Sequence, residues 1–181
     1  MYLVITASPN ADGLTAACGR AALRGLEQAG KTGEIIDLCA LKIQGCLVCG
    51  DGWGICREEH RCVIEDEFSV LQARLKEAEG LVLVTPVYWG QQSERIKYFC
   101  DRLRRCEARK GNGSVLARKK TNLVAAAGGT GNGTVSCLTD MELWCRHVGA
   151  IPFERIGVTR FNREPMLAVI EQASKELVAT P

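Results

Sequence analysis

Four cysteines within seventeen residues are the side chains of this sequence best suited to carry chemistry. Cys46, Cys49, Cys56 and Cys62 follow the spacing C-x2-C-x6-C-x5-C, with three glycines between the second and the third. Thiolates are soft ligands that select iron–sulfur clusters or zinc. A segment of this length without apolar periodicity needs something to hold it together, and four thiolates around a metal centre would do so.

Three kinds of chemistry fit this quartet, and its spacing favours one of them. A structural zinc site usually presents two close pairs, whereas five residues separate Cys56 from Cys62. Cys46 and Cys49 could instead form a redox disulfide, because a C-x-x-C motif lowers the thiol pKa. Ligand softness and spacing favour an iron–sulfur cluster, with zinc and thiol chemistry as alternatives. His60 lies in the same segment and is interpreted as a solvated side chain.

The composition is typical of one soluble globular domain. Of 181 residues, 46% are hydrophobic and 24% charged, and the formal net charge of +2 says little about partners. Met1 leads directly into an apolar run with no signal-peptide pattern, and no run approaches the ~20 residues of a membrane span. We therefore expect a cytoplasmic protein, in which ten cysteines indicate metal or redox chemistry rather than disulfides. The cysteines outside the quartet are interpreted as small buried hydrophobes: Cys18, Cys39, Cys100, Cys106, Cys137 and Cys145.

Strand and helix patterns alternate five times along the chain. The expected strands are 2–7, 34–38, 81–85, 122–127 and 151–158, with Pro86 ending the third. The expected helices are 14–29, 68–78, 96–103, 137–148 and 164–178. Such alternation predicts a single α/β domain over 1–181, with a parallel sheet, helices on both faces and a cysteine-rich segment at 39–65.

Three unusual loops follow the first, third and fourth strands. Ligands of parallel sheets bind beyond the carboxyl ends of the strands, so these loops should converge on one crevice, with the cysteine segment beside it. The loop Ser8–Thr15 opens a helix, and its N–H groups with the hydroxyls of Ser8 and Thr15 could surround a phosphate. The alternative is a plain turn capped by Asp12. A Walker motif is absent from the sequence, which argues against an NTPase.

The other two loops are suited to a planar ligand. In Pro86–Gln92, Tyr88 and Trp89 offer flat surfaces, although single aromatic residues more often serve packing. The loop 128–133 has four glycines, which let a backbone approach a ligand closely. Its spacing and its place after the fourth strand do not match a Rossmann fingerprint.

Together these motifs resemble the flavodoxin-like NAD(P)H-dependent FMN reductase family, and more closely its iron–sulfur flavoprotein branch. The resemblance covers nearly the whole chain in the correct order. It is carried by Ala7-Ser8-Pro9…Gly13-Leu14-Thr15, the cysteine segment leading into Cys62-Val63-Ile64-Glu65-Asp66, Pro86-Val87-Tyr88…Ile96-Lys97…Asp101-Arg102, and Gly128-Gly129…Asn132-Gly133.

The resemblance implies a doubly wound, five-stranded parallel sheet in the order 2-1-3-4-5. It implies FMN with its phosphate on the first loop and its ring between the other two, and a [4Fe–4S] cluster on the cysteine quartet. It also implies a homodimer or homotetramer in which the cluster and flavin of neighbouring subunits approach. The implied FMN contacts are Ser8, Asn10, Gly13, Leu14, Thr15, Pro86, Val87, Tyr88, Trp89, Gly90, Gly128, Gly129, Thr130, Asn132 and Gly133.

Three departures from the family pattern concern the predicted sites. Asn10 occupies the position of the family's usual arginine in the phosphate loop, and Leu14 occupies that of its usual asparagine. Residues 50–55 lengthen the gap between the second and third cysteines beyond the branch's compact motif. Trp53 and Trp89 are bulky additions near the expected flavin face.

The resemblance implies an oxidoreductase that passes electrons between a ferredoxin-like donor or NAD(P)H and a small-molecule acceptor, with no protein acid or base assigned. A cluster-free NAD(P)H-dependent reductase of quinones, nitro compounds or flavin is one alternative, and a zinc-containing binding module without turnover is another. Neither a nucleic-acid nor a membrane partner is expected. A basic group is interpreted as a solvated face: Arg102, Arg104, Arg105, Arg109, Lys110, Arg118, Lys119 and Lys120.

Overall fold

One sheet forms the centre of the computed structural model, which describes residues 1–179. Its strands are β1 (Tyr2–Thr6), β2 (Gly33–Asp37), β3 (Gly80–Tyr88), β4 (Gln91–Gln92), β5 (Lys120–Ala127) and β6 (Ile151–Thr159). Five of them run parallel in the order β2-β1-β3-β5-β6, which confirms the predicted flavodoxin-like order. β4 pairs antiparallel with β3 and corrects the predicted strand count.

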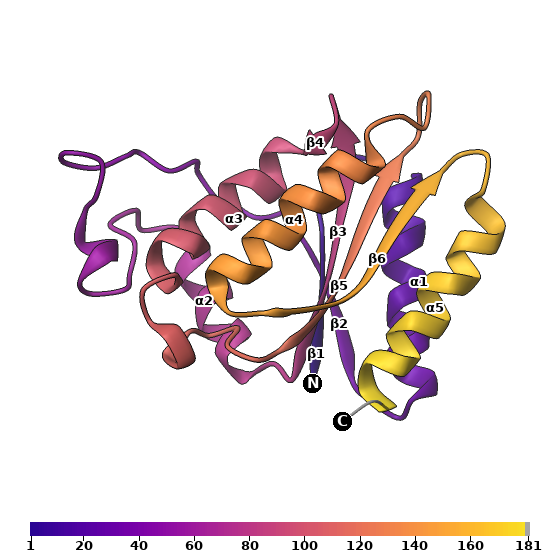
Figure 1. Cartoon of the computed structure of the whole chain (residues 1–181), viewed down its shortest axis with the longest axis horizontal. Coiled ribbons are helices and arrows are strands. Elements are labelled where there is room, and N and C mark those ends of the chain that lie inside the picture. Colours follow the sequence, from indigo (N-terminus) through magenta and orange to yellow (C-terminus); the bar gives the residue numbers. More distant parts are fainter. Residues whose placement is uncertain (180–181) are drawn as a thin grey trace.

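Helices cover both faces of the sheet, as Figure 1 shows. They are α1 (Leu14–Gln28), α2 (Phe68–Glu77), α3 (Glu94–Glu107), α4 (Thr134–Val148) and α5 (Arg163–Ala179). The pair α1 and α5 packs on one face, and α2, α3 and α4 lie on the other. Each face has its own hydrophobic core, so the central strands are covered on both sides. Leu81, Leu83 and Val84 of β3 are accordingly fully buried.

An aromatic group ties the helices of one face together. The ring of Phe99 on α3 lies 6.4 Å from that of Phe68 on α2 and 6.3 Å from that of Trp144 on α4, each pair tilted. Trp144 also donates its indole N–H to the carbonyl oxygen of Cys100 at 3.0 Å. Tilted aromatic pairs add stability beyond their burial, so α3 is held firmly between its neighbours.

The prediction that Pro86 ends the third strand is wrong. Pro86 forms the last pair of β3 with β5, opposite Ala126, and β3 continues to Tyr88. A proline at the end of a ladder removes only one donor, which explains why the strand tolerates it. Beyond it, Trp89 and Gly90 form a two-residue turn with φ of 53° and 78° that leads into β4. Positive φ at both positions is typical of a tight β-hairpin turn.

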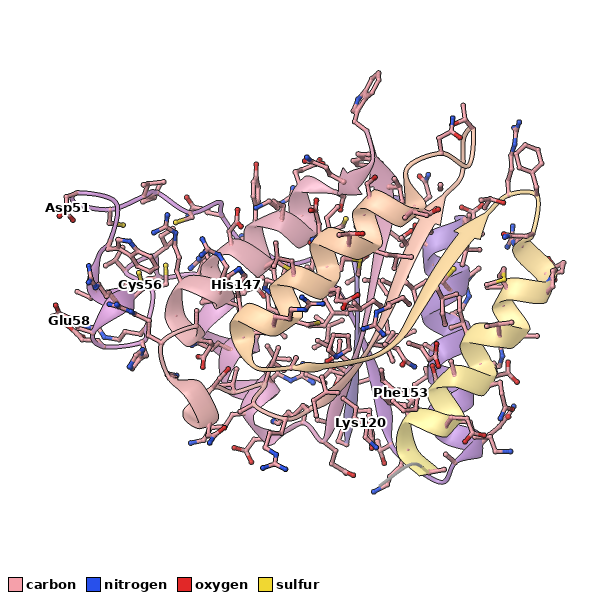
Figure 2. The ribbon with its side chains drawn as sticks, viewed as in Figure 1. Asp51, Cys56, Glu58, Lys120, His147 and Phe153 are labelled. Carbon is pink, nitrogen blue, oxygen red and sulfur yellow. The ribbon has the colours of Figure 1, made fainter. Side chains whose placement is uncertain are left out.

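The segment between β2 and α2 contains one short 3-10 turn, Ile55–Arg57, in an otherwise irregular path. Figure 1 shows it reaching away from the sheet past α3, and Figure 2 labels Asp51, Cys56 and Glu58 on it. The burial prediction for the other cysteines is confirmed for five of the six, whereas Cys39 is half-buried. Residues 180 and 181, which the domain prediction includes, lie outside the described residues. Among residues 1–179, none of the helices has the length and apolar character needed to cross a membrane.

Candidate functional site

The hairpin turn after β3 packs directly on the glycine-rich loop after β5. A Cβ on Gly133 (φ 84°) would lie 2.6 Å from the Cα of Gly90, so the two backbones touch. Ser136 stabilises the contact, because its Oγ lies 2.8 Å from the carbonyl oxygen of Gly90 and 3.1 Å from that of Gly133. The structure therefore brings the second and third predicted loops together, and it adds Ser136, which carries no motif in the sequence.

These two loops enclose a groove of about 400 Å³. A Cβ on Gly128 or Gly129 would meet no atom within 4 Å, so the backbone there faces open space. The side chain of Trp89 is fully exposed. Its backbone has a positive φ, which bulky residues rarely adopt. The predicted residues that line the groove are Val87, Trp89, Gly90, Gly129, Thr130, Asn132 and Gly133. Three predicted residues of the same two loops do not line the groove: Pro86, Tyr88 and Gly128.

The first loop forms a compact turn of its own. Ser8 Oγ donates to the carbonyl oxygen of Asn10 at 2.6 Å, and the N–H of Gly13 donates to the same oxygen at 3.1 Å. α1 begins at Leu14 without a side-chain cap, so the proposed Asp12 cap is wrong. The first N–H groups of the helix thus have no side-chain acceptor, which suits an anion.

The structure does not place this first loop in the groove of the other two. Ser8 lines a separate cavity of about 350 Å³ that also contains Arg20 and Asp37. Arg20, which the sequence did not single out, donates from Nη1 to the carbonyl oxygen of Ala11 at 2.7 Å. The loops still share one edge of the sheet, because β1, β3 and β5 run parallel.

All four cysteines of the quartet line a single cavity beside the C-terminal half of α3. Within the described residues, no three His, Cys, Asp or Glu side chains are arranged to hold one metal ion. A zinc site needs its sulfurs within about 2.3 Å of one point, so these side chains are not placed for it. A [4Fe–4S] cluster binds each cysteine through a different iron, so its ligands need only surround a cavity.

Cys106 of α3 lines the same cavity as a fifth thiol. Burial, with smaller contributions from Cys62 and Cys56 nearby, raises the pKa of the Cys106 thiol to about 12. Cys106 lies on α3, outside the segment that carries the quartet.

Arg102 also borders the cysteine cavity, and the interpretation of Arg102 as part of a solvated face is wrong. Its side chain is fully buried, and Nη1 donates to Asp66 at 2.6 Å. The guanidinium lies 4.3 Å from the ring centre of Phe68. Burial raises the pKa of Asp66, but the hydrogen bonds from Arg102, Gln44 and Phe68 outweigh it and lower that pKa below its usual range. The pair is therefore ionised within the fold.

Two further contacts hold the cysteine segment against α3. Arg105 lies 4.8 Å above the ring of Trp53 and donates to the carbonyl oxygen of Gly52 at 2.5 Å. Trp53 thus packs against Arg105 of α3 and does not line the groove between the hairpin and the glycine-rich loop of its own chain. His60, predicted to be solvated, is half-buried, and its Nδ1 lies 3.1 Å from the carbonyl oxygen of Cys106.

The cysteine cavity and the groove lie at opposite ends of α3. Glu94 begins the helix next to the hairpin, and Cys106 lies twelve residues later, about 18 Å along the axis at 1.5 Å per residue. Figure 1 shows the cysteine segment reaching away from the loops after β3 and β5. The expectation that the segment lies beside the crevice therefore holds only for its start, where Cys39 and Ala40 line the cavity of Ser8, whereas the quartet lies away from the crevice of its own chain.

A parallel sheet in this order, with ligand-facing loops at its carboxyl edge, defines a flavodoxin-like α/β protein. Residues 2–161 match the family described as NADPH-dependent FMN reductase. The chain belongs to this family of FMN-dependent oxidoreductases.

Curated relatives confirm the predicted likeness to iron–sulfur flavoproteins. The chain is 34% identical to "Iron-sulfur flavoprotein MJ1083" of Methanocaldococcus jannaschii over 100 residues, which are 55% of this chain and 50% of that protein. It is 32% identical to an "Iron-sulfur flavoprotein" of Archaeoglobus fulgidus over 129 residues, which are 71% of this chain and 62% of that protein. The chain thus spans about half to three fifths of the length of these relatives.

Solved structures share the fold at low sequence identity. The NAD(P)H:quinone oxidoreductase from Methanothermobacter marburgensis matches with a TM-score of 0.77 and 21% identity, covering 97% of this chain and 94% of that one. A flavodoxin of Streptococcus pneumoniae matches with a TM-score of 0.66 and 15% identity, covering 99% of both chains.

Proposed function

We propose that this protein is an oxidoreductase that holds FMN and one [4Fe–4S] cluster, and that it passes electrons between a donor and a small acceptor. The observation that carries the proposal is the single cavity that Cys46, Cys49, Cys56 and Cys62 surround. Relatives named iron–sulfur flavoproteins support it. The donor is a ferredoxin-like protein or NAD(P)H, the latter supported by the family name, and we propose a cytoplasmic location.

The three loops at the carboxyl edge would hold FMN. The uncapped start of α1 offers N–H groups to the phosphate, and the glycine-rich backbone of 128–133 can approach a planar ring closely. Val87 and Trp89 would border the ring from the hairpin. When bound, FMN supplies two-electron chemistry and the cluster supplies one-electron transfer.

The separation along α3 supports an oligomer. Because Glu94 beside the hairpin and Cys106 in the cysteine cavity lie about 18 Å apart along α3, electron transfer within one chain would be long. A homodimer or homotetramer can instead bring the cysteine cavity of one subunit to the groove of another.

A cluster-free NAD(P)H-dependent reductase is the second candidate. It is favoured by the structural match to a quinone oxidoreductase over 94% of that chain. In this case the cysteine segment would serve packing alone. A zinc-containing binding module is the weakest alternative, because the described side chains do not converge on a single ion.

A cysteine substitution series tests the proposal. Each quartet residue is replaced by serine, and Cys106→Ala is the matched control, because Cys106 lines the same cavity from α3, outside the quartet's segment. After anaerobic purification, we expect each quartet variant to lose most of its iron and sulfide but to keep FMN, while Cys106→Ala keeps all three. Quartet variants with the iron and sulfide content of the wild type would refute the ligand assignment.

A further inference from the structure

The cysteine cavity contains a buried cation that the proposed ligand set does not explain. Arg102 is 1% exposed and borders the cavity together with the quartet. Long charged side chains are almost never fully buried unless they are paired. Asp66 supplies that pairing through one end of the guanidinium, and its own side chain is 5% exposed.

The guanidinium joins two points of the chain that flank the quartet. Its Nη1 donates to the carbonyl oxygen of Gln44 at 3.2 Å, two residues before the first cysteine of the quartet. Its Nη2 donates to the carbonyl oxygen of Ile64 at 3.3 Å, two residues after the last. The planar fork of an arginine can make these bonds at once, which a lysine ammonium cannot reproduce in the same geometry.

One nitrogen of this fork has no partner. Nε of Arg102 is buried and makes no hydrogen bond among the described residues. A buried donor without an acceptor is costly, and native structures seldom leave one unexplained. Cys62 lines the same cavity as Arg102, and the bond from Nη2 to the carbonyl oxygen of Ile64 fixes the guanidinium two residues from it along the chain. A thiolate sulfur at Cys62 would supply the missing acceptor.

We propose that Arg102 is a positioning residue for the cluster, donating from Nε to the ligand sulfur of Cys62 and stabilising the reduced, more negative state. This inference rests on the proposed function. Hydrogen bonds to ligand sulfurs and nearby positive charge raise the reduction potential of iron–sulfur clusters. Arg102 therefore sets the potential as well as the shape of the site.

The test compares the reduction potential of the cluster in three variants, measured by a titration followed by electron paramagnetic resonance. Arg102→Met combined with Asp66→Asn removes both charges together, so no carboxylate is left buried alone. Arg102→Lys keeps the charge but loses the fork. Arg104→Met is the matched control, because Arg104 is a half-buried arginine on α3 that lines a different groove, between α3 and α4.

For the double variant we expect the midpoint potential to fall by at least 59 mV, which is a tenfold change in the ratio of oxidised to reduced cluster for one electron. Arg102→Lys should fall less, and Arg104→Met should match the wild type. A double variant that keeps FMN but loses iron and sulfide would support the positioning role directly. A fully loaded double variant with unchanged potential would overturn this inference alone. A wild type that lacks iron and sulfide would refute the proposed function itself, and this inference with it.

Discussion

Gly133→Ala should destabilise the protein even without a cofactor, whereas Gly129→Ala should not. Gly133 has φ of 84°, where an alanine costs about 1–2 kcal/mol. Its Cβ would lie 2.6 Å from the Cα and 3.0 Å from the N of Gly90, and backbone atoms cannot move away as a flexible side chain can. We expect a total loss of at least ~2 kcal/mol, or about 4–8 °C in Tm for a domain of this size.

The matched variant separates the fold from the ligand site. Gly129 lines the groove and its Cβ would meet nothing within 4 Å, so Gly129→Ala should leave the stability of the apoprotein unchanged within about 1 kcal/mol. If 128–133 cradles FMN, the added methyl group should weaken FMN binding about tenfold, which is about 1.4 kcal/mol. Thermal unfolding of the apoproteins and FMN titration by fluorescence quenching measure the two effects. Equal Tm values for Gly133→Ala and wild type would refute the backbone contact, and unchanged FMN affinity in Gly129→Ala would refute the cradle.

Two further substitutions test a buried hydrogen bond between β3 and the start of α3 and a group of ion pairs on the surface. Thr85→Val should lower the free energy of unfolding, measured in urea, by about 1–3 kcal/mol, because Thr85 Oγ1 accepts a hydrogen bond from the buried N–H of Ser93 at 3.1 Å. Thr85→Ser keeps the hydroxyl and should lower this free energy clearly less. Hydrogen bonds from Arg155 and Arg146 lower the pKa of Glu142 to about 2 from an ordinary value of 4.5, so this group stabilises the fold above about pH 4.5 and the benefit is lost as the pH falls toward 2. Glu142→Gln should therefore flatten the decline of Tm over that acid range, and an unchanged decline would contradict the ion pairs.

The parallel sheet could be predicted from the sequence because its strands are short apolar runs that alternate with helical patterns, and the order of the strands followed from the family resemblance. The hairpin at Trp89 and Gly90 could not, since a tryptophan at positive φ contradicts its own backbone preference. Pro86 also misled the prediction, because a proline usually ends a strand and here stands at the last pair of a ladder.

That Cys46, Cys49, Cys56 and Cys62 line one cavity could be predicted, because cysteines in one short segment lie near one another. The burial of Arg102 could not, because its partners Asp66, Gln44 and Ile64 lie 36 to 58 residues away in the chain. Beside other basic residues, Arg102 has the pattern of a solvated surface. The distance between the cysteine cavity and the groove was missed for a similar reason, because loop order along a sheet does not say how far an irregular segment extends.

The most direct test of the proposed function is quantitation of iron, acid-labile sulfide, zinc and FMN in anaerobically purified protein, with a visible spectrum of the same sample. We predict close to four iron and four sulfide atoms and one FMN per chain, with a broad absorption shoulder that dithionite bleaches. Flavin bands without iron and sulfide, in protein that cannot be reconstituted with them, would contradict it.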